Sequence, residues 1–456
     1  MNASSSNRIR CGKVLKLGLT LLASGIAPLL LPAPAQAAPP QTGVACTTSA
    51  SPDATHPTFT LDATDGYIQL ADGNTMYMWG YANGGGAFQH PGPVLCVNEG
   101  DTITVILNNY LSEDVSIMFP GQENVLANGA AAQPQFDPTT LALTSLTNVA
   151  AKTSGSVSYS FTASQPGTFV YESGTNPQKQ VRLGLFGALV VRPAIDVNLG
   201  GNKFVFNRAD SQFTADEEFM VLLSEIDPYL HQAAERGKSF NFNNYQARYW
   251  LINGRGFPDS ISDNFSPFLP DQPYGALARI HPYNNTAAAT DPAYHPYPGA
   301  IRYLNVGTEE FPFHPHGNNG LVIGRDGRPL EGPRATPTTE GADLSFEKFA
   351  INIGPGQTWD VLFKWNDAEG YNSSTNPVPV VIPQVNNQEF GMFYSGSPYL
   401  GETGTLPPGA STLNECGAYY IISHNHALFQ ITSWGVNMSG PITYVRVDPP
   451  LPNACP

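Results

Sequence analysis

The chain has 456 residues, with 22 Lys and Arg against 37 Asp and Glu, which gives a formal net charge of −15. Its 13% share of charged residues is about half of that in an average soluble domain, which excludes coiled coils, helical solenoids and disordered tails. An acidic surface repels phosphate groups, and the basic residues do not cluster beyond the first twenty positions. We therefore expect no nucleic acid and no anionic membrane among the partners.

The first 37 residues have the order of a targeting segment. Four basic residues between positions 8 and 16 precede an apolar run at 17–31, and Ala35-Gln36-Ala37 fits the small-residue rule for cleavage. We predict a signal peptide at 1–37, a mature chain that begins at Ala38, and a secreted or periplasmic location. No later run reaches the roughly 18 apolar residues of a membrane span, so none is expected.

Four cysteines remain once Cys11 has left with the signal peptide. An even number in an exported chain favours two disulfides, although the sequence alone leaves three connectivities open. Proximity along the chain favours Cys46 with Cys96 and Cys416 with Cys455.

Short runs of β-branched and aromatic residues, bounded by turn residues, predict an all-β fold of two β-sandwiches. The domain expected at 38–195 has its strands at 102–107, 156–161, 167–171 and 187–191. The domain expected at 196–456 has strands at 218–223, 300–304, 359–363 and 418–422, and an insertion loop at about 239–298. One helix is predicted at 227–236, because Asp227 can cap it, Pro228 suits its first position and Gly237 suits its end.

Two His-x-His pairs, His314-Pro315-His316 and His424-Asn425-His426, carry the strongest chemical signal in the sequence. Side chains at positions i and i+2 of a strand point to the same face, so each pair offers two imidazoles to one small volume. Neutral imidazole is the commonest metal ligand and suits copper and zinc. We predict a metal site formed by His314, His316, His424 and His426.

The other five histidines are expected to have structural roles. We expect His231, on the predicted helix, to face solvent or to cap a neighbour. The remaining four lie beside proline or in proline-rich loops: His56, His90, His281 and His295.

The residues around these histidines resemble a known family. The segment 310–317, Glu-Phe-Pro-Phe-His-Pro-His-Gly, resembles the His-Pro-x-His-Leu-His-Gly motif of multicopper oxidases. Segments 171–174 and 184–191 resemble their Tyr-His-Ser-His and Gly-Leu-x-Gly-Ala-Leu-Val-Val stretch, and segment 355–362 is similar to their Pro-Gly-Glu-x-Tyr-Asp-Val-Leu turn. The resemblance runs from Gly66 to Pro449. It implies two cupredoxin-like Greek-key β-sandwich domains with copper as the cofactor.

The resemblance also implies that half of the family's cluster ligands are replaced. The first two His-x-His motifs match Met118 with Pro120 and Glu172 with Gly174, whereas the third and fourth motifs survive as the two pairs described above. Met118 or Glu172 would assist if a second copper were bound.

At the type 1 copper, Phe311, Asn425 and Gln430 match the family's His, Cys and His. A blue copper centre needs a thiolate and two imidazoles. Four-electron chemistry of the laccase kind is therefore not expected.

These features predict an exported multicopper-oxidase-like protein that binds copper at a reduced four-His site, has no type 1 centre and is an oxidoreductase if it is active. One alternative is a mononuclear copper or zinc enzyme with an open ligand position. Another is a non-catalytic cupredoxin-fold protein with a structural or interaction role. The sequence does not identify the small-molecule substrate or electron donor, or the oligomeric state.

Overall fold

The computed structural model describes residues 42–194, 202–336, 339–366, 419–448 and 450, and three short strands between 385 and 413. The expected signal peptide at 1–37 lies outside the described residues. So do Cys416 and Cys455, which leaves the second predicted disulfide undescribed. None of the described helices is long and apolar enough to cross a bilayer.

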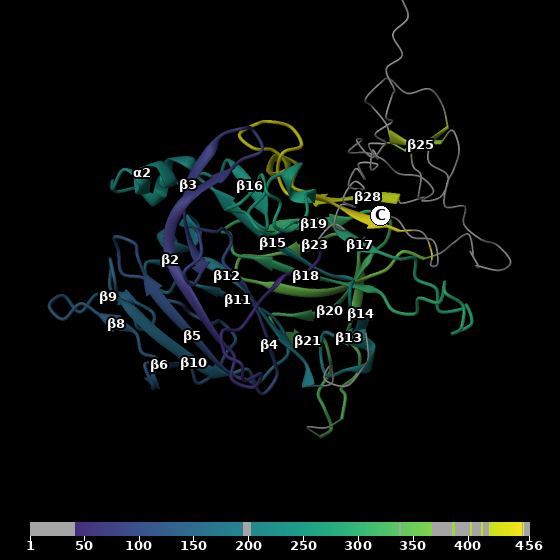
Figure 1. Cartoon of the computed structure of the whole chain (residues 1–456), viewed down its shortest axis with the longest axis horizontal. Coiled ribbons are helices and arrows are strands. Elements are labelled where there is room, and N and C mark those ends of the chain that lie inside the picture. The colour runs from purple at the N-terminus through teal and green to yellow at the C-terminus, as the bar shows by residue number, and fades with distance from the viewer. Residues whose placement is uncertain are drawn as a thin grey trace, which may run out of the picture. The chain divides into compact units, whose positions relative to one another are not determined.

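Two sheets, coloured purple to blue in Figure 1, build the N-terminal β-sandwich. In sheet order, sheet I consists of β3 (Thr75–Asn83), β2 (Thr58–Gln69), β5 (Thr102–Asn109), β10 (Ser156–Thr162), β6 (Leu126–Ala127) and β7 (Ala130–Ala131). Sheet II consists of β1 (Cys46–Thr47), β4 (Val94–Asn98), β12 (Phe186–Arg192) and β11 (Gly167–Glu172).

Two further sheets build the C-terminal β-sandwich. In sheet order, sheet III consists of β16 (Tyr249–Ile252), β15 (Glu218–Ile226), β18 (Gly299–Asn305), β24 (Thr358–Phe363), β20 (Gly320–Arg325) and β21 (Arg328–Pro329), and β22 (Phe346–Lys348) also pairs with β20. Sheet IV consists of β17 (Ala278–Ile280), β29 (Ile442–Val447), β28 (Tyr419–Asn425), β19 (Phe311–Pro315) and β23 (Ile351–Ile353).

The remaining strands form small ribbons. They are β8 (Gln135–Phe136) with β9 (Leu143–Ser145), β13 (Asn202–Phe204) with β14 (Gln212–Thr214), and β25 (Val385–Asn387) between β26 (Glu402–Thr403) and β27 (Thr412–Leu413). The α-helices among the described residues are α1 (Pro177–Leu183) and α2 (Pro228–Glu235).

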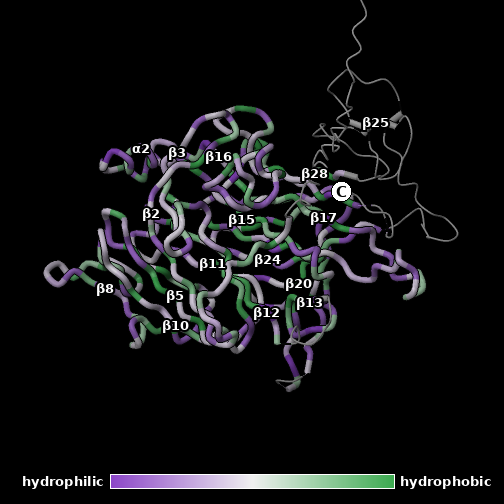
Figure 2. The backbone as a smooth tube through the Cα atoms, in the orientation of Figure 1, coloured by the Kyte–Doolittle hydropathy of each residue, from purple (hydrophilic) through white to green (hydrophobic). Residues whose placement is uncertain are grey.

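Alternation of apolar and polar residues explains why these strands pair into sandwiches. In β5 the isoleucine, valine and leucine side chains at 103, 105 and 107 are buried, while those at 102, 104 and 106 are not. Buried side chains of sheets I and II form one core, and those of sheets III and IV form a second. Hydrophobic stretches accordingly fall on inner strands such as β5, β12 and β15 in Figure 2. This architecture confirms the predicted fold class.

Sheets II and III pack against each other, so their strands are buried on both faces. Every residue of β12, β15 and β18 is buried. Val170 and Val190 of sheet II share an apolar cluster with Met220, Leu222 and Leu304 of sheet III. The two sandwiches are therefore joined by a continuous apolar layer.

A buried network of charged side chains crosses this layer. Glu218 accepts hydrogen bonds from Arg192 and, at 2.6 Å, from Nε of Arg302. Nη1 of Arg302 donates to Oδ1 of Asp360 at 3.0 Å and to Oγ1 of Thr168 at 2.8 Å. Burial raises the pKa of Glu218, but the two guanidinium groups outweigh it and lower that pKa to about 2.

The predicted elements agree closely with the described ones. Of the eight predicted strands, seven fall within observed strands, and the eighth does so from Tyr419 onward. The predicted helix is α2, where Asp227 caps Tyr229 N at 2.9 Å and Gly237 follows with φ +60°. Helix α1 was not predicted, although Asn176 before it, Pro177 at its first position and Gly184 after it are the usual boundary residues.

The first predicted disulfide is confirmed. Cys46 and Cys96 are bonded, with their Cα atoms 5.5 Å apart, because β1 pairs with β4 and brings them side by side. Two strands, β16 and β17, lie within the range expected to be an insertion loop, and each is an edge strand of the C-terminal sandwich.

Candidate metal centre

The alternation of β19 decides where its histidines point. Phe311 and Phe313 are fully buried in the core of the C-terminal sandwich, whereas His314 and His316 are partly exposed. Since successive side chains of a strand point to opposite faces, the phenylalanines anchor the strand and turn His314 outward.

The pairing of β19 with β28 brings the two His-x-His motifs together. His314 lies directly opposite His424 in this antiparallel pair. His316 N donates to Ile422 O at 3.1 Å, and His426 N donates to Pro312 O at 2.7 Å, so the pairing continues on both sides. All four imidazoles therefore project from one face of sheet IV.

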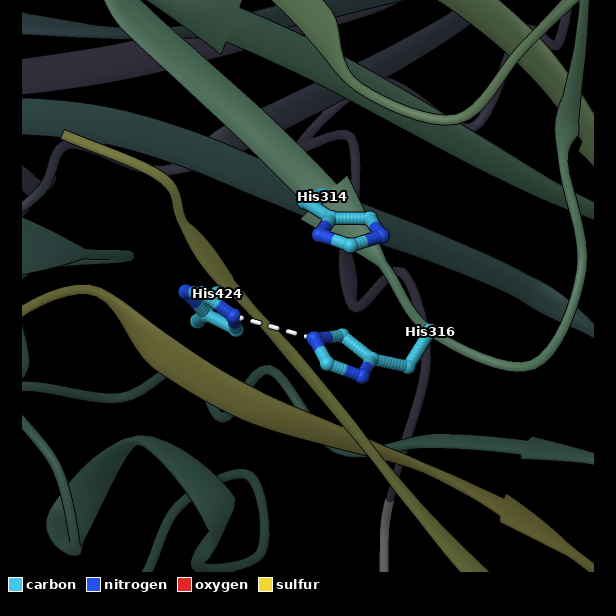
Figure 3. Close-up of side chains that lie close together, drawn as sticks. All are labelled: His314, His316 and His424. Atoms are coloured by element: carbon cyan, nitrogen blue, oxygen red, sulfur yellow. Dashed lines mark hydrogen bonds between the residues drawn. The ribbon is translucent and has the colours of Figure 1, made fainter. Parts of the chain in front are cut away.

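Three of the four rings converge on one point. The nitrogens of His314, His316 and His424 lie within 4.8 Å of one another, and Nε2 of His316 is 3.0 Å from Nε2 of His424 (Figure 3). The His314 and His316 rings are stacked, with centroids 4.3 Å apart. His426 is exposed and lies at the edge of this group, with its ring centroid 5.4 Å from that of His314 and 5.7 Å from that of His424.

The surroundings of His314, His316 and His424 favour the neutral imidazole, in which one ring nitrogen has a lone pair that can bind a metal. Burial, together with the neighbouring imidazoles, lowers the pKa of His314 to about 4, and the pKa values of His316 and His424 are lowered for the same reasons. Nδ1 of His424 is 2.8 Å from Asn425 O, so this nitrogen carries the hydrogen. The lone pair of Nε2 then accepts a hydrogen bond from Nε2 of His316 (Figure 3), and a metal ion would take the place of that hydrogen. Nδ1 of His314 is buried and has no hydrogen-bond partner among the described residues.

An exposed aromatic side chain borders the group. Phe349 is 57% exposed, and its ring lies edge-on to His314 at 4.8 Å and to His426 at 6.5 Å. It follows β22 and carried no signal in the sequence that connected it with the histidines.

A hydrogen-bonded network occupies the positions that match type 1 copper ligands. The side chains of Asn425 and Gln430 are buried and bonded to each other, and Nε2 of Gln430 donates to Glu309 at 2.6 Å. Trp250 Nε1 also donates to Glu309, at 2.9 Å. Phe311 lies in the apolar core.

The residues that match the first two motifs lie together in the N-terminal sandwich. Met118 and Glu172 form a backbone bridge, with N–O distances of 2.7 and 3.1 Å. A Cβ atom at Gly174 would come within 2.7 Å of Cγ of Met118, so the methionine packs directly against this glycine. Glu172 does not belong to the converging group of ligand atoms in the described part of the chain.

One of the remaining histidines, His231, lies in a different environment from the expected solvent-facing one. His231 does not face solvent: it is fully buried, and its Nδ1 lies 2.7 Å from Tyr77 O, because α2 turns this side toward β3. His281 and His295 both contact the buried carboxylate of Glu217, at 3.0 and 3.3 Å. His90 is buried, and His56 is exposed beside Asp53.

Comparison with known proteins shows which family the N-terminal sandwich is similar to. Residues 62–195 match the family model described as multicopper oxidase. This part of the chain is similar to the multicopper oxidases. Within this family, L-ascorbate oxidase of Cucurbita maxima is 36% identical over 189 residues. That match spans 40% of the chain and 28% of the ascorbate oxidase.

Solved structures of multicopper oxidases share the fold. The multicopper oxidase mgLAC is 17% identical, with a TM-score of 0.52, and the match covers 86% of each chain. The blue copper oxidase of Nitrosomonas europaea is also 17% identical, with a TM-score of 0.51, and covers 86% of this chain and 85% of that one. These sandwiches therefore have the cupredoxin fold, and copper is the cofactor of the family.

Proposed function

We propose that this multicopper oxidase relative binds copper through His314, His316 and His424, with His426 beside them, and that it is an oxidoreductase without a type 1 centre. The observation that carries the proposal is the convergence of three ring nitrogens, two of them 3.0 Å apart. The domain limits of 38–195 and 196–456 and export after cleavage at Ala37 belong to the same proposal.

The donor set fits a copper ion. A metal bound by imidazole lies about 2.0 Å from each nitrogen, so two ligands of one ion are roughly 3–3.5 Å apart. The facing Nε2 atoms of His316 and His424 have this spacing. All three imidazoles favour the neutral form that binds a metal.

The surrounding residues determine what such a site could do. Bound copper would supply one-electron redox chemistry. The carbonyl of Asn425 orients the ring of His424, and the partly exposed side chains of His314 and His316 would be accessible to a small donor. Asn425 and Gln430 provide no thiolate relay, so electrons would have to enter at the histidines themselves.

Metal analysis tests the site. We expect the purified mature chain to bind copper stoichiometrically, and His316→Ala or His424→Ala to abolish this uptake while the protein stays folded. Because His426 lies outside the converging group, His426→Ala should retain copper. His56→Ala is the matched control, since His56 is an exposed histidine that contacts Asp53.

Other outcomes separate the alternatives. Copper resonance spectra should lack the signature of a copper–thiolate bond, and an intense thiolate absorption band would refute the assignment of Phe311, Asn425 and Gln430. Exclusive zinc binding would favour a mononuclear zinc enzyme. No metal uptake by the wild-type chain would favour a non-catalytic role.

N-terminal sequencing tests the proposed export. The sequence of the secreted protein should begin at Ala38, and a retained Met1 would refute export by this signal.

A further inference from the structure

A cavity lies beside the C-terminal sandwich, and none of its lining residues belongs to the histidine group. Its volume is about 270 Å³. Leu321 and Leu362 contribute an apolar surface, and Tyr283 and Tyr297 line it from the segment expected to be an insertion loop. Asn318, in the turn after β19, and Lys364, after β24, add polar groups.

Lys364 gives this cavity its charge. Its ammonium group lies over the ring of Tyr283, 4.6 Å from the centroid. No carboxylate lies within ion-pair distance of it among the residues that the structure describes, although the whole chain has a net charge of −15. A cation–π contact leaves the ammonium able to bind an anion.

The acidic residues of the lining do not cancel this charge. Asp210 is already held by Arg208, whose Nε donates to Oδ1 at 2.9 Å and whose Nη2 donates to Oδ2. Glu347 is exposed, where water and salt screen it. A monoanion is therefore favoured over a dianion such as phosphate.

The walls are fixed before any ligand arrives. Tyr283 N donates to Trp365 O at 2.6 Å, and Asn318 Nδ2 donates to Lys364 O at 2.7 Å. His281 and His295, which flank this part of the segment, are both held by Glu217. A rigid pocket loses less entropy on binding than a mobile one.

We propose that this cavity binds a small monocarboxylate with a flat apolar ring, of the size and shape of benzoate. The carboxylate would pair with Lys364 and accept hydrogen bonds from the neighbouring amides, while the ring would lie among the tyrosines and above the leucines. This assignment is independent of the copper proposal, since it uses different residues and needs no metal.

Calorimetry with three ligands of one shape tests the proposal. Benzoate should bind the full-length mature chain, benzamide should bind about tenfold or more weakly because it lacks the charge, and benzylammonium should not bind. Added salt should weaken benzoate binding. Acetate should bind about tenfold or more weakly than benzoate, because it has no ring to bury.

Two variants identify the residues responsible. Lys364→Met should reduce benzoate affinity to that of benzamide, whereas Lys348→Met, which changes an exposed lysine of β22 outside the lining, should leave it unchanged. Tyr297→Ala should weaken benzoate and benzamide by the same factor. Unchanged benzoate affinity in Lys364→Met, equal affinity for acetate, or no saturation below about 10 mM benzoate would overturn the proposal.

Discussion

The imidazole of His314 should make the proposed copper site tolerant of acid. Its pKa is lowered to about 4 by burial and by the neighbouring rings, so it stays neutral at a pH where an ordinary histidine, with a pKa of about 6.5, is protonated. Protons compete with metal for the same lone pair. We expect copper to be retained as the pH falls below 6.5 and to be lost as it approaches 4.

Equilibrium dialysis across this range measures the effect. Release of copper centred at pH 6.5 would contradict the lowered pKa of His314. His426→Ala should shift the midpoint toward neutral pH only slightly, since loss of this imidazole removes one minor cause of the lowered His314 pKa while burial, the largest cause, remains.

At the residue scale, the sequence predicted that the histidines of a pair share one face of their strand, but not which histidines of the two pairs lie closest together. The i, i+2 spacing was enough to place His314 with His316 on one side of a strand. That His316 lies closest to His424, and His426 at the edge, depends on the register of β19 against β28, which spacing alone does not set. His231 was assigned to the wrong environment because one buried turn of a short helix has no visible periodicity.

Asp227, which caps helix α2, also holds a segment that follows the helix. One carboxylate oxygen of Asp227 accepts from Tyr229 N at 2.9 Å, and the other accepts from Gln246 N at 2.7 Å. Asp227→Ala should lower the free energy of unfolding by about 2–3 kcal/mol, as it removes the cap and leaves Gln246 N without its acceptor.

Denaturant unfolding measures this loss. Asp227→Asn is the matched control, because its side-chain oxygen can still cap Tyr229 N and should recover part of the difference. Equal stability of Asp227→Ala and the wild-type chain would show that water replaces both contacts.

At the scale of elements, turn and cap residues determined which predictions were reliable. The strands were located because β-branched runs end at Gly, Pro, Asn or Asp, and α2 because Asp227, Pro228 and Gly237 mark its limits. Helix α1 has equivalent markers, but its seven residues are too few for a helical pattern of apolar residues to show. The strands β16 and β17 are short, and only pairing with distant partners identifies them.

The charged network between the sandwiches should make the whole molecule sensitive to acid. Burial opposes ionisation of Glu218, yet Arg192 and Arg302 lower its pKa from the model-compound value of 4.5 to about 2. A carboxylate whose pKa is lower in the folded chain stabilises the fold above pH 4.5, and this stabilisation disappears as the pH falls toward 2. The shift corresponds to ~3 kcal/mol.

Glu218→Gln tests this contribution. The variant should be less stable than the wild-type chain by about 3–5 kcal/mol near neutral pH, because the buried guanidinium of Arg192 loses its carboxylate partner and that of Arg302 keeps only Asp360. The difference should shrink as the pH falls from 4.5 toward 2, when the wild-type carboxylate is also neutralised. Glu123→Gln, at an exposed position, is the control and should show no such pH dependence. A constant difference at all pH values would contradict the assigned pKa.

This network could not be predicted from the sequence. Arg192, Glu218 and Arg302 come from three strands of two sheets, and nothing in their local sequence identifies them as partners. The two-sandwich fold can be predicted from local sequence patterns, whereas the contacts between the sandwiches depend on how the finished sheets pack.

The alternation in β19 also makes metal uptake a test of correct folding. Phe313 faces inward and His314 faces outward on consecutive residues, so a slip of β19 by one position would place a histidine in the apolar core and a phenylalanine on the outer face. Misregistered chains could keep their sheet content and still have no converging imidazoles. Copper stoichiometry after refolding would therefore count the molecules whose strands have paired correctly, which a spectrum of secondary structure cannot do.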